Sequence, residues 1–287
     1  MTATPPHAPG DPGFPRPAGT HGAPGTSYPG MSYVEIGVRE AARSLDFYCG
    51  LLGLRPVPEG PEPPQPGVHW LDAQGAFVKL VETGSDSLHG WRRDDLQRGM
   101  RHVGLKVGDV FRQAERLRAA GVEFAIEPTA AVGEVNLAFF QDPDGTLLEI
   151  IDGHLHYHSV TTPELAEREA ELARVRPAAA PPVFDHVAIT VADLDATLEF
   201  YRERLGYPVI GRLVHEQDPR GFVIDYLQAG PAVLEVFTFT APGVRTEPAP
   251  PPGDRLGLRA LGLATAEGAA PATADPDGVP LRQVPAR

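Results

Sequence analysis

The chain has 287 residues, of which 42% are hydrophobic and 22% charged, the composition of a soluble globular protein with room for two ordinary domains. Its formal net charge of -13 argues against a nucleic-acid partner, because phosphate binding needs a basic face. No run of about 18 apolar residues is present to span a membrane, and the single cysteine without a visible secretory signal leads us to expect a cytoplasmic protein.

The N-terminal stretch differs in composition from the rest of the chain. Residues 1–30 are dominated by Pro, Gly, Ala and Thr, and their few apolar side chains cannot offset the entropy that is lost on ordering. We therefore expect a disordered tail. Two further Pro-rich stretches, RPAAAPP (176–182) and TEPAPPPGD (246–254), predict linkers.

One pattern then recurs along the chain. Unit A (31–84) has an alternating apolar strand, an apolar helical stripe and a final strand AFVKLVE. Unit B (99–152) repeats this order and ends on the hairpin LAFFQDPDGTLLEIIDG, with a Pro-Asp-Gly turn. Unit C (183–239) reads as a strand, a helix that Gly206 ends, and three strands. Unit D (256–287) keeps the first strand and the last hairpin, but it has lost the helix and, we expect, the middle strands.

These units predict an α+β fold in a two-domain single chain. The first domain would comprise residues 31–152 and the second residues 183–287. The segment between them, residues 153–182, contains TPELAEREAELARVR, whose charges at i,i+4 spacing predict a solvated connecting helix.

Two positions of each unit carry residues that could do chemistry: the one that opens the first strand and the one in the middle of the last strand. His102 and Glu149 occupy them in unit B, 47 residues apart, and His186 and Glu235 in unit C, 49 residues apart. A glutamate inside an apolar strand is unusual, and its recurrence at matched spacing favours a functional pair. Units A and D offer two cations and no carboxylate there: Tyr33, Lys79, Ala260 and Arg282.

The repeated βαβββ unit, the helix ends DFY…LLGL and EFY…RLGY, and the turn DPDGTLLEI resemble the vicinal oxygen chelate superfamily, the group of glyoxalase I, bleomycin-resistance proteins and extradiol dioxygenases. The resemblance covers residues 31–287. It implies that βαβββ units pair into cupped mixed β-sheets, where each unit offers a metal a His from its first strand and a Glu from its last. It says little about the reaction, since one fold hosts many chemistries.

The family pairs its units in two ways. Four-unit relatives of glyoxalase I pair A with D and B with C, whereas two-domain extradiol dioxygenases pair A with B and C with D. The first arrangement places all four ligands in one cup, called here the site cup, and none in the other, the second cup. Because a site that is lost loses all its ligands together, the all-or-none distribution favours B with C.

The resemblance makes His102, Glu149, His186 and Glu235 the ligands of one divalent ion, and this N/O set suits Zn²⁺, Ni²⁺, Co²⁺, Fe²⁺ or Mn²⁺. Two positions on the ion would stay open for a small-molecule substrate with vicinal oxygens. The implied function is that of a lyase, isomerase or epimerase acting through a metal-chelated enediolate. One of the two glutamates would be the general base, and the sequence does not rank them. His215 and Tyr226 are candidate substrate-binding residues.

Two other functions stay open. An extradiol-type Fe(II) dioxygenase uses two His and one carboxylate, so one glutamate would have to stay off the metal. A binding or resistance protein would hold a small molecule without turnover, although such relatives typically lack the ligands. The tract HLHYHS, with His154, His156 and His158, looks like a metal tract, but we expect the polar end of a strand leaving unit B. The protein is expected to be a monomer or homodimer.

Overall fold

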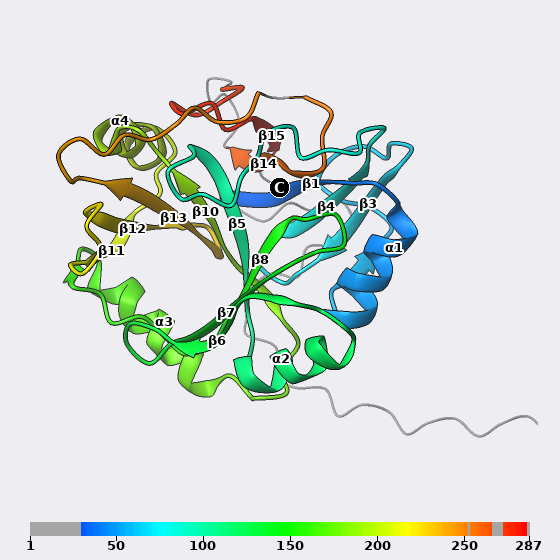
Figure 1. The fold of residues 1–287 in the computed structure, drawn as a ribbon, viewed down its shortest axis with the longest axis horizontal. Coiled ribbons are helices and arrows are strands. Elements are labelled where there is room, and N and C mark those ends of the chain that lie inside the picture. Colours follow the sequence, from blue (N-terminus) through cyan, green and yellow to red (C-terminus); the bar gives the residue numbers. More distant parts are fainter. Residues whose placement is uncertain (1–29, 252, 266–271, 286–287) are drawn as a thin grey trace, which may run out of the picture.

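The computed structural model of the chain describes residues 30–251, 253–265 and 272–285 (Figure 1). The expected disordered tail lies outside these residues except for Gly30, which begins the first strand. Among the described residues, none of the helices is both long enough and apolar enough to cross a membrane.

Units B and C, with the short strand β9 from the segment between them, form one nine-stranded sheet in the order β6-β7-β8-β5-β10-β13-β12-β11-β9. At its centre β5 pairs antiparallel with β10, while β8 lies parallel to β5 and β13 lies parallel to β10. The bounds of its strands are β5 (Gly99–Lys106), β6 (Phe124–Ala130), β7 (Asn136–Gln141), β8 (Leu147–Ile151), β9 (Ser159–Val160), β10 (Val183–Thr190), β11 (Val209–His215), β12 (Phe222–Ala229) and β13 (Ala232–Phe239).

Units A and D form a six-stranded sheet in the order β15-β14-β1-β4-β3-β2. Its strands are β1 (Gly30–Val38), β2 (Arg55–Val57), β3 (Val68–Asp72), β4 (Phe77–Glu82), β14 (Gly257–Thr265) and β15 (Leu281–Pro285). The predicted pairing of A with D and of B with C is therefore confirmed. Since each sheet draws strands from both halves of the chain, the division into domains 31–152 and 183–287 stays a prediction about the sequence.

Strand alternation separates a core face from a cup face in both sheets. Side chains such as Val34, Leu105 and Val187 belong to one large buried cluster that takes members from both sheets. On neighbouring positions of the same strands, Tyr33 and His102 point the other way. The apolar residues that predicted the strands therefore build the core, and the residues between them line the cups.

Helices lie around the periphery of the two sheets (Figure 1). They are α1 (Ala41–Leu45) with the π-helical turn η1 (Asp46–Leu51), α2 (Val110–Ala119), α3 (Pro163–Val175), and α4 (Leu194–Leu198) with the π-helical turn η2 (Glu199–Arg204). The connecting helix expected between units B and C is α3. In the described part of the segment between β14 and β15, residues 272–280, no helix is present, in line with the loss predicted for unit D.

Two equivalent hydrogen bonds join neighbouring units. The buried Tyr48 hydroxyl, in the helix of unit A, donates to Asp142 of unit B at 2.8 Å. Tyr201, in the helix of unit C, donates to Asp275 of unit D at 3.0 Å. Each aspartate opens an Asp-Pro-Asp-Gly turn, and its carboxylate also accepts a hydrogen bond from the backbone N–H of the second aspartate of that turn. The FY and DPDG motifs thus act together, because a buried hydroxyl needs a partner.

The histidine tract departs from its predicted structure. We expected it to be the end of a strand, but β8 stops at Ile151 and residues 154–157 have no regular secondary structure. The chain instead turns at Gly153, where φ is 64°, and crosses towards β9. Gly adopts such a conformation more readily than any other residue, and this is the signal that the strand ends here.

Candidate metal centre

Four ionisable side chains meet on the cup face of the nine-stranded sheet. His102 lies on β5, Glu149 on β8, His186 on β10 and Glu235 on β13, and all four are buried. The strand register arranges them in two rows. Glu149 and His186 both face Gly104, while His102 and Glu235 both face Ala188. The sheet therefore brings together the whole predicted ligand set from two separate units.

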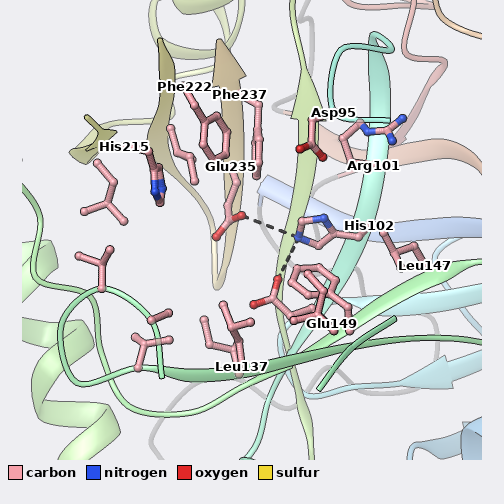
Figure 2. Close-up of a pocket in the computed structure, with 18 of the residues that line it drawn as sticks. Asp95, Arg101, His102, Leu137, Leu147, Glu149, His215, Phe222, Glu235 and Phe237 are labelled. Atoms are coloured by element: carbon pink, nitrogen blue, oxygen red, sulfur yellow. Dashed lines mark ion pairs between the residues drawn. The ribbon is translucent and has the colours of Figure 1, made fainter. Parts of the chain in front are cut away.

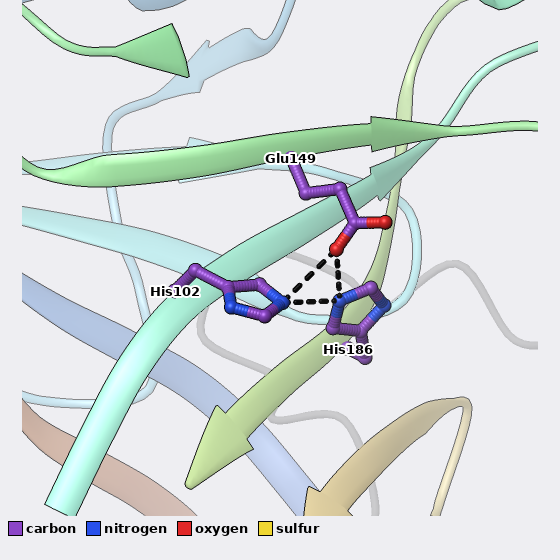
Figure 3. Close-up of side chains that lie close together, drawn as sticks. All are labelled: His102, Glu149 and His186. Atoms are coloured by element: carbon purple, nitrogen blue, oxygen red, sulfur yellow. Dashed lines mark hydrogen bonds and ion pairs between the residues drawn. The ribbon is translucent and has the colours of Figure 1, made fainter. Parts of the chain in front are cut away.

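Three of the four form a close triangle (Figure 3). The Nε2 atoms of His102 and His186 lie 3.1 Å apart. The Oε2 atom of Glu149 lies 3.0 Å from His102 Nε2 and 3.2 Å from His186 Nε2. Glu235 stands further off, with its Oε2 atom 3.9 Å and 3.6 Å from the same two nitrogens. The two glutamates are thus not equivalent, although their sequence positions are.

Gly104 makes room for one of the imidazoles. A Cβ atom at this position would lie 2.0 Å from Cε1 of His186. Any other residue would push the ring away from the centre of the cup. Sequence reasoning missed this residue, but its signal is visible: it is a glycine two positions after His102 inside an apolar strand.

Asp185 is a second residue that sequence reasoning missed. Its Oδ2 atom lies 2.9 Å from Nδ1 of His186, and its Oδ1 atom lies 3.7 Å from the ammonium of Lys106. With Nδ1 engaged, His186 presents Nε2 to the cup. A carboxylate behind an imidazole is the usual support of a metal-ligating histidine, since it fixes ring and tautomer.

The pKa values of Glu149 and His186, two members of the triangle, are shifted strongly from their usual values. Burial by itself would raise the pKa of Glu149, but hydrogen bonds from His102 and His186 outweigh burial and lower it. Burial likewise opposes a charge on His186, yet the nearby carboxylates of Glu235, Asp185 and Glu149 raise its pKa well above the usual value. The cup therefore holds a net negative field that attracts a positive charge, whether a proton or a metal ion.

The other two members show opposite shifts. Burial lowers the pKa of His102, which favours its neutral imidazole, the form that binds a metal. Burial, reinforced by the charges of Glu149 and Asp185, raises the pKa of Glu235. Glu235 is accordingly the better proton acceptor of the two glutamates, and Glu149 the one that stays a carboxylate.

The donor set fits a divalent transition ion. Two imidazole nitrogens 3.1 Å apart and a carboxylate oxygen within 3.2 Å of both can bind the same small cation. Two neutral imidazoles and two carboxylates would balance its charge. Burying two carboxylates and two imidazoles side by side is costly, which agrees with a site built for a cation.

The centre lies at one side of a cavity of about 460 Å³ (Figure 2). His215 and Tyr226, the two predicted substrate-binding residues, both line it. The His215 ring stacks on the Phe222 ring with their centroids 4.5 Å apart. The buried Nε2 atom of His215 has no hydrogen-bond partner among the described residues. Much of the remaining wall is apolar: Val132, Leu137, Phe139, Leu213, Ile224 and Phe237.

The second cup is closed by an ion-pair network. Nζ of Lys79 lies 2.9 Å from Oε2 of Glu35 and 2.6 Å from Oε2 of Glu62. The Tyr33 hydroxyl donates a hydrogen bond to Oε1 of Glu62. The four positions equivalent to the ligands offer two cations and no carboxylate, as we noted from the sequence. The two carboxylates come from elsewhere: Glu35 sits two positions along the strand from Tyr33, and Glu62 comes from a loop. Neither occupies a position equivalent to a ligand.

Comparison with known proteins agrees with this architecture. The model of the Glyoxalase/Bleomycin resistance protein/Dioxygenase superfamily matches residues 30–150 and 183–274. A "Probable lactoylglutathione lyase" of Synechocystis sp. is 29% identical over 124 residues, which is 42% of this chain and 93% of that protein. "Lactoylglutathione lyase" of Pseudomonas aeruginosa is 27% identical over 153 residues, which is 44% of this chain and 84% of that protein.

Solved structures share the fold over almost the whole chain. Glyoxalase I from Zea mays superposes with a TM-score of 0.59 at 19% identity, covering 89% of this chain and 92% of the maize protein. The family model accounts for most of the residues, and units of both sheets fall within it. The chain therefore belongs to the glyoxalase, bleomycin resistance protein and dioxygenase superfamily.

Proposed function

We propose that the protein is a divalent-metal-dependent enzyme of the lyase or isomerase type, which moves a proton within a small substrate that carries neighbouring oxygens. The observation that carries this proposal is the convergence of two imidazoles and two glutamates, from four strands, on the wall of a cavity. His102, His186 and Glu149 would hold the ion, with Glu235 beside them. When bound, the ion would supply Lewis-acid stabilisation of negative charge on the substrate oxygens.

Glu235 is our candidate for the general base. Its carboxylate is the one that stands apart from the triangle, and its raised pKa gives it the proton affinity that abstraction from carbon requires. It would take the proton from the carbon next to the substrate carbonyl and return it to the neighbouring carbon. The proton balance then closes within one substrate, and no other reactant is consumed.

His215 and Tyr226 are our candidates for substrate positioning. His215 has a free ring nitrogen in the cavity, and burial lowers its pKa, so it is a neutral hydrogen-bonding group. Tyr226 pairs across the sheet with Glu235, and its buried hydroxyl stays protonated because burial and nearby carboxylates raise its pKa. Together they would orient a polar group of the substrate over Glu235, while the apolar wall would take its hydrocarbon part.

A ring-cleaving dioxygenase is the second candidate. The three groups nearest one another are two His and one Glu, which is the ligand set of many Fe(II) oxygenases. Two observations favour the lyase. Glu235 is within 4 Å of both imidazoles, at 3.6 Å and 3.9 Å, and units B and C are paired as in glyoxalase I. The names of the two curated relatives point the same way.

The test is metal analysis of the purified protein, followed by assays with and without O₂. The lyase proposal predicts a bound divalent ion and O₂-independent turnover of one or more α-oxo thiol adducts. Turnover of catechols with matching O₂ consumption would favour the dioxygenase. A protein without metal that binds such compounds without converting them would favour a binding or resistance role and contradict both enzymatic proposals.

A further inference from the structure

A second group of potential metal ligands lies outside the site cup. It comprises Glu134, His154 and His156, whose ligand atoms fall within 4.8 Å of one another. Nε2 of His156 is 3.2 Å from Nε2 of His154. Oε2 of Glu134 is 3.6 Å from Nδ1, the other nitrogen of the His154 ring, so the exposed Glu134 side chain would turn towards the two Nε2 atoms to share an ion with them. This is the histidine tract that the sequence makes conspicuous and that the site cup does not use.

The two imidazoles are spaced like those of the site cup. Their Nε2 atoms are 3.2 Å apart, against 3.1 Å between His102 and His186. Two nitrogens at about 2.0–2.1 Å from one tetrahedral ion would be separated by about 3.3 Å. The pair therefore already has the separation that a shared ion would impose.

The backbone that carries the two histidines is held on both sides. Glu169 of α3 accepts the Leu155 N–H at 3.2 Å and the Tyr157 hydroxyl at 2.6 Å. The Glu134 N–H donates to the His154 carbonyl at 3.3 Å. Binding an ion would thus require little ordering of the main chain, which is a main cost at a surface site.

The three potential ligands lie next to residues that form the wall of the cavity. Leu155, between the two histidines, lines the cavity, as do Val132 and Val135 on the neighbouring turn. An ion shared by Glu134 and the two histidines would tie that turn to the 154–156 segment from outside. It would therefore stiffen this part of the cavity wall without contacting the substrate.

We propose that Glu134, His154 and His156 form a second site for a divalent transition ion such as Zn²⁺, with water completing the coordination. The ligand types suit Zn²⁺, Ni²⁺ or Co²⁺, and they are unsuited to Mg²⁺ or Ca²⁺, which prefer oxygen. Glu134 is 67% exposed, so water competes for the site and its affinity is lower than that of the site cup.

The experiment is equilibrium dialysis of the full chain against Zn²⁺, with bound metal measured at each concentration. We expect two binding events in the unchanged protein. The double variant His154→Ala/His156→Ala should lose the weaker event and keep the tighter one. Glu134→Gln should weaken the weaker event by about tenfold or more, since even supporting residues contribute 10–100-fold to metal affinity.

Two matched variants separate this site from the site cup. His102→Ala/His186→Ala should lose the tighter event and keep the weaker one. His89→Ala, at an exposed histidine outside both groups, should change neither event. The proposal is overturned if His154→Ala/His156→Ala binds as many ions with the same affinities as the unchanged chain, or if only one event is seen in the unchanged chain.

Discussion

The site cup and the second cup have the same strand register but opposite contents. In the site cup, His186 faces Gly104 on the adjacent strand, so a large ligand meets a residue without a side chain. In the second cup, Ala260 faces Glu35, so the small residue is on the other strand. In each of these two pairs, one strand carries a large side chain and the strand facing it carries a small one or none. The pairs differ in which strand carries the large side chain and in its chemistry.

The comparison shows how a cup without ligands keeps a stable centre. Lys79 occupies the position in unit A that Glu149 occupies in unit B. Lys79 pairs with Glu35, two residues after Tyr33, and Glu149 pairs with Gly104, two residues after His102. Its ammonium lies between Glu35 and Glu62 and 5.4 Å from the Tyr33 ring. The Arg259 guanidinium adds a second cation, since its Nε atom lies 3.2 Å from Glu35. Permanent cations of the protein thus neutralise the carboxylates of the second cup, as we propose a metal ion does in the site cup.

The largest effect is expected for Glu235→Gln in the site cup. Loss of a general base typically lowers the rate by about 10²–10⁴-fold, whereas the triangle of His102, His186 and Glu149 remains to hold the ion. Turnover and bound metal should be measured on the same preparation. Glu149→Gln is the matched control, and it should lose metal more readily. Equal loss of metal in both variants would show that Glu235 is a ligand like any other.

Lys79→Met should be the most damaging change in the second cup. It removes the ammonium from the half-buried Glu62 and leaves the buried Glu35 with only Arg259, whose Nε atom lies 3.2 Å away. Breaking a buried ion pair typically costs about 3–5 kcal/mol of unfolding free energy. The measurement is the denaturant midpoint, with metal content followed in parallel. Arg204→Met, which removes an exposed pair with Glu199, serves as the control and should change the midpoint little. A loss of bound metal from folded Lys79→Met would contradict the separation of the two cups.

Two glycines allow a matched test of what each cup does. In Gly104→Ala the new Cβ would lie 2.0 Å from the His186 ring, and in Gly262→Ala it would lie 2.0 Å from the Tyr33 ring. Overpacking of this kind costs about 1–3 kcal/mol, so both variants should be destabilised to a similar degree. Only Gly104→Ala should also lose metal affinity and turnover. If Gly262→Ala lost them equally, the second cup would have a functional role.

The smallest effect concerns pH. The pKa of His186 is raised in the metal-free protein, so at neutral pH its imidazole carries a proton that an ion must displace. Metal affinity should therefore rise with pH, by up to about tenfold per unit for each proton released, until the pKa of His186 is passed. Titration calorimetry in two buffers of different ionisation enthalpy would count the protons. No proton release near pH 7 would mean that His186 is already neutral.

Repetition made much of this site predictable. Alternating apolar residues located the central strands, and the recurrence of His and Glu at matched spacing gave all four cup residues and the pairing of the units. Two features were out of reach because they depend on neighbours distant in sequence. Glu62 reaches the second cup from a loop, and the inequality of Glu149 and Glu235 comes from side-chain distances. The end of the strand before the histidine tract had a local signal, Gly153, that the prediction did not use.

The most direct test of the account is anomalous diffraction at the zinc edge from crystals of the full chain grown with Zn²⁺. The account predicts a peak about 2.0–2.1 Å from Nε2 of both His102 and His186, and none beside Lys79. A peak between Glu35 and Glu62 in the second cup, or no peak between His102 and His186, would contradict it.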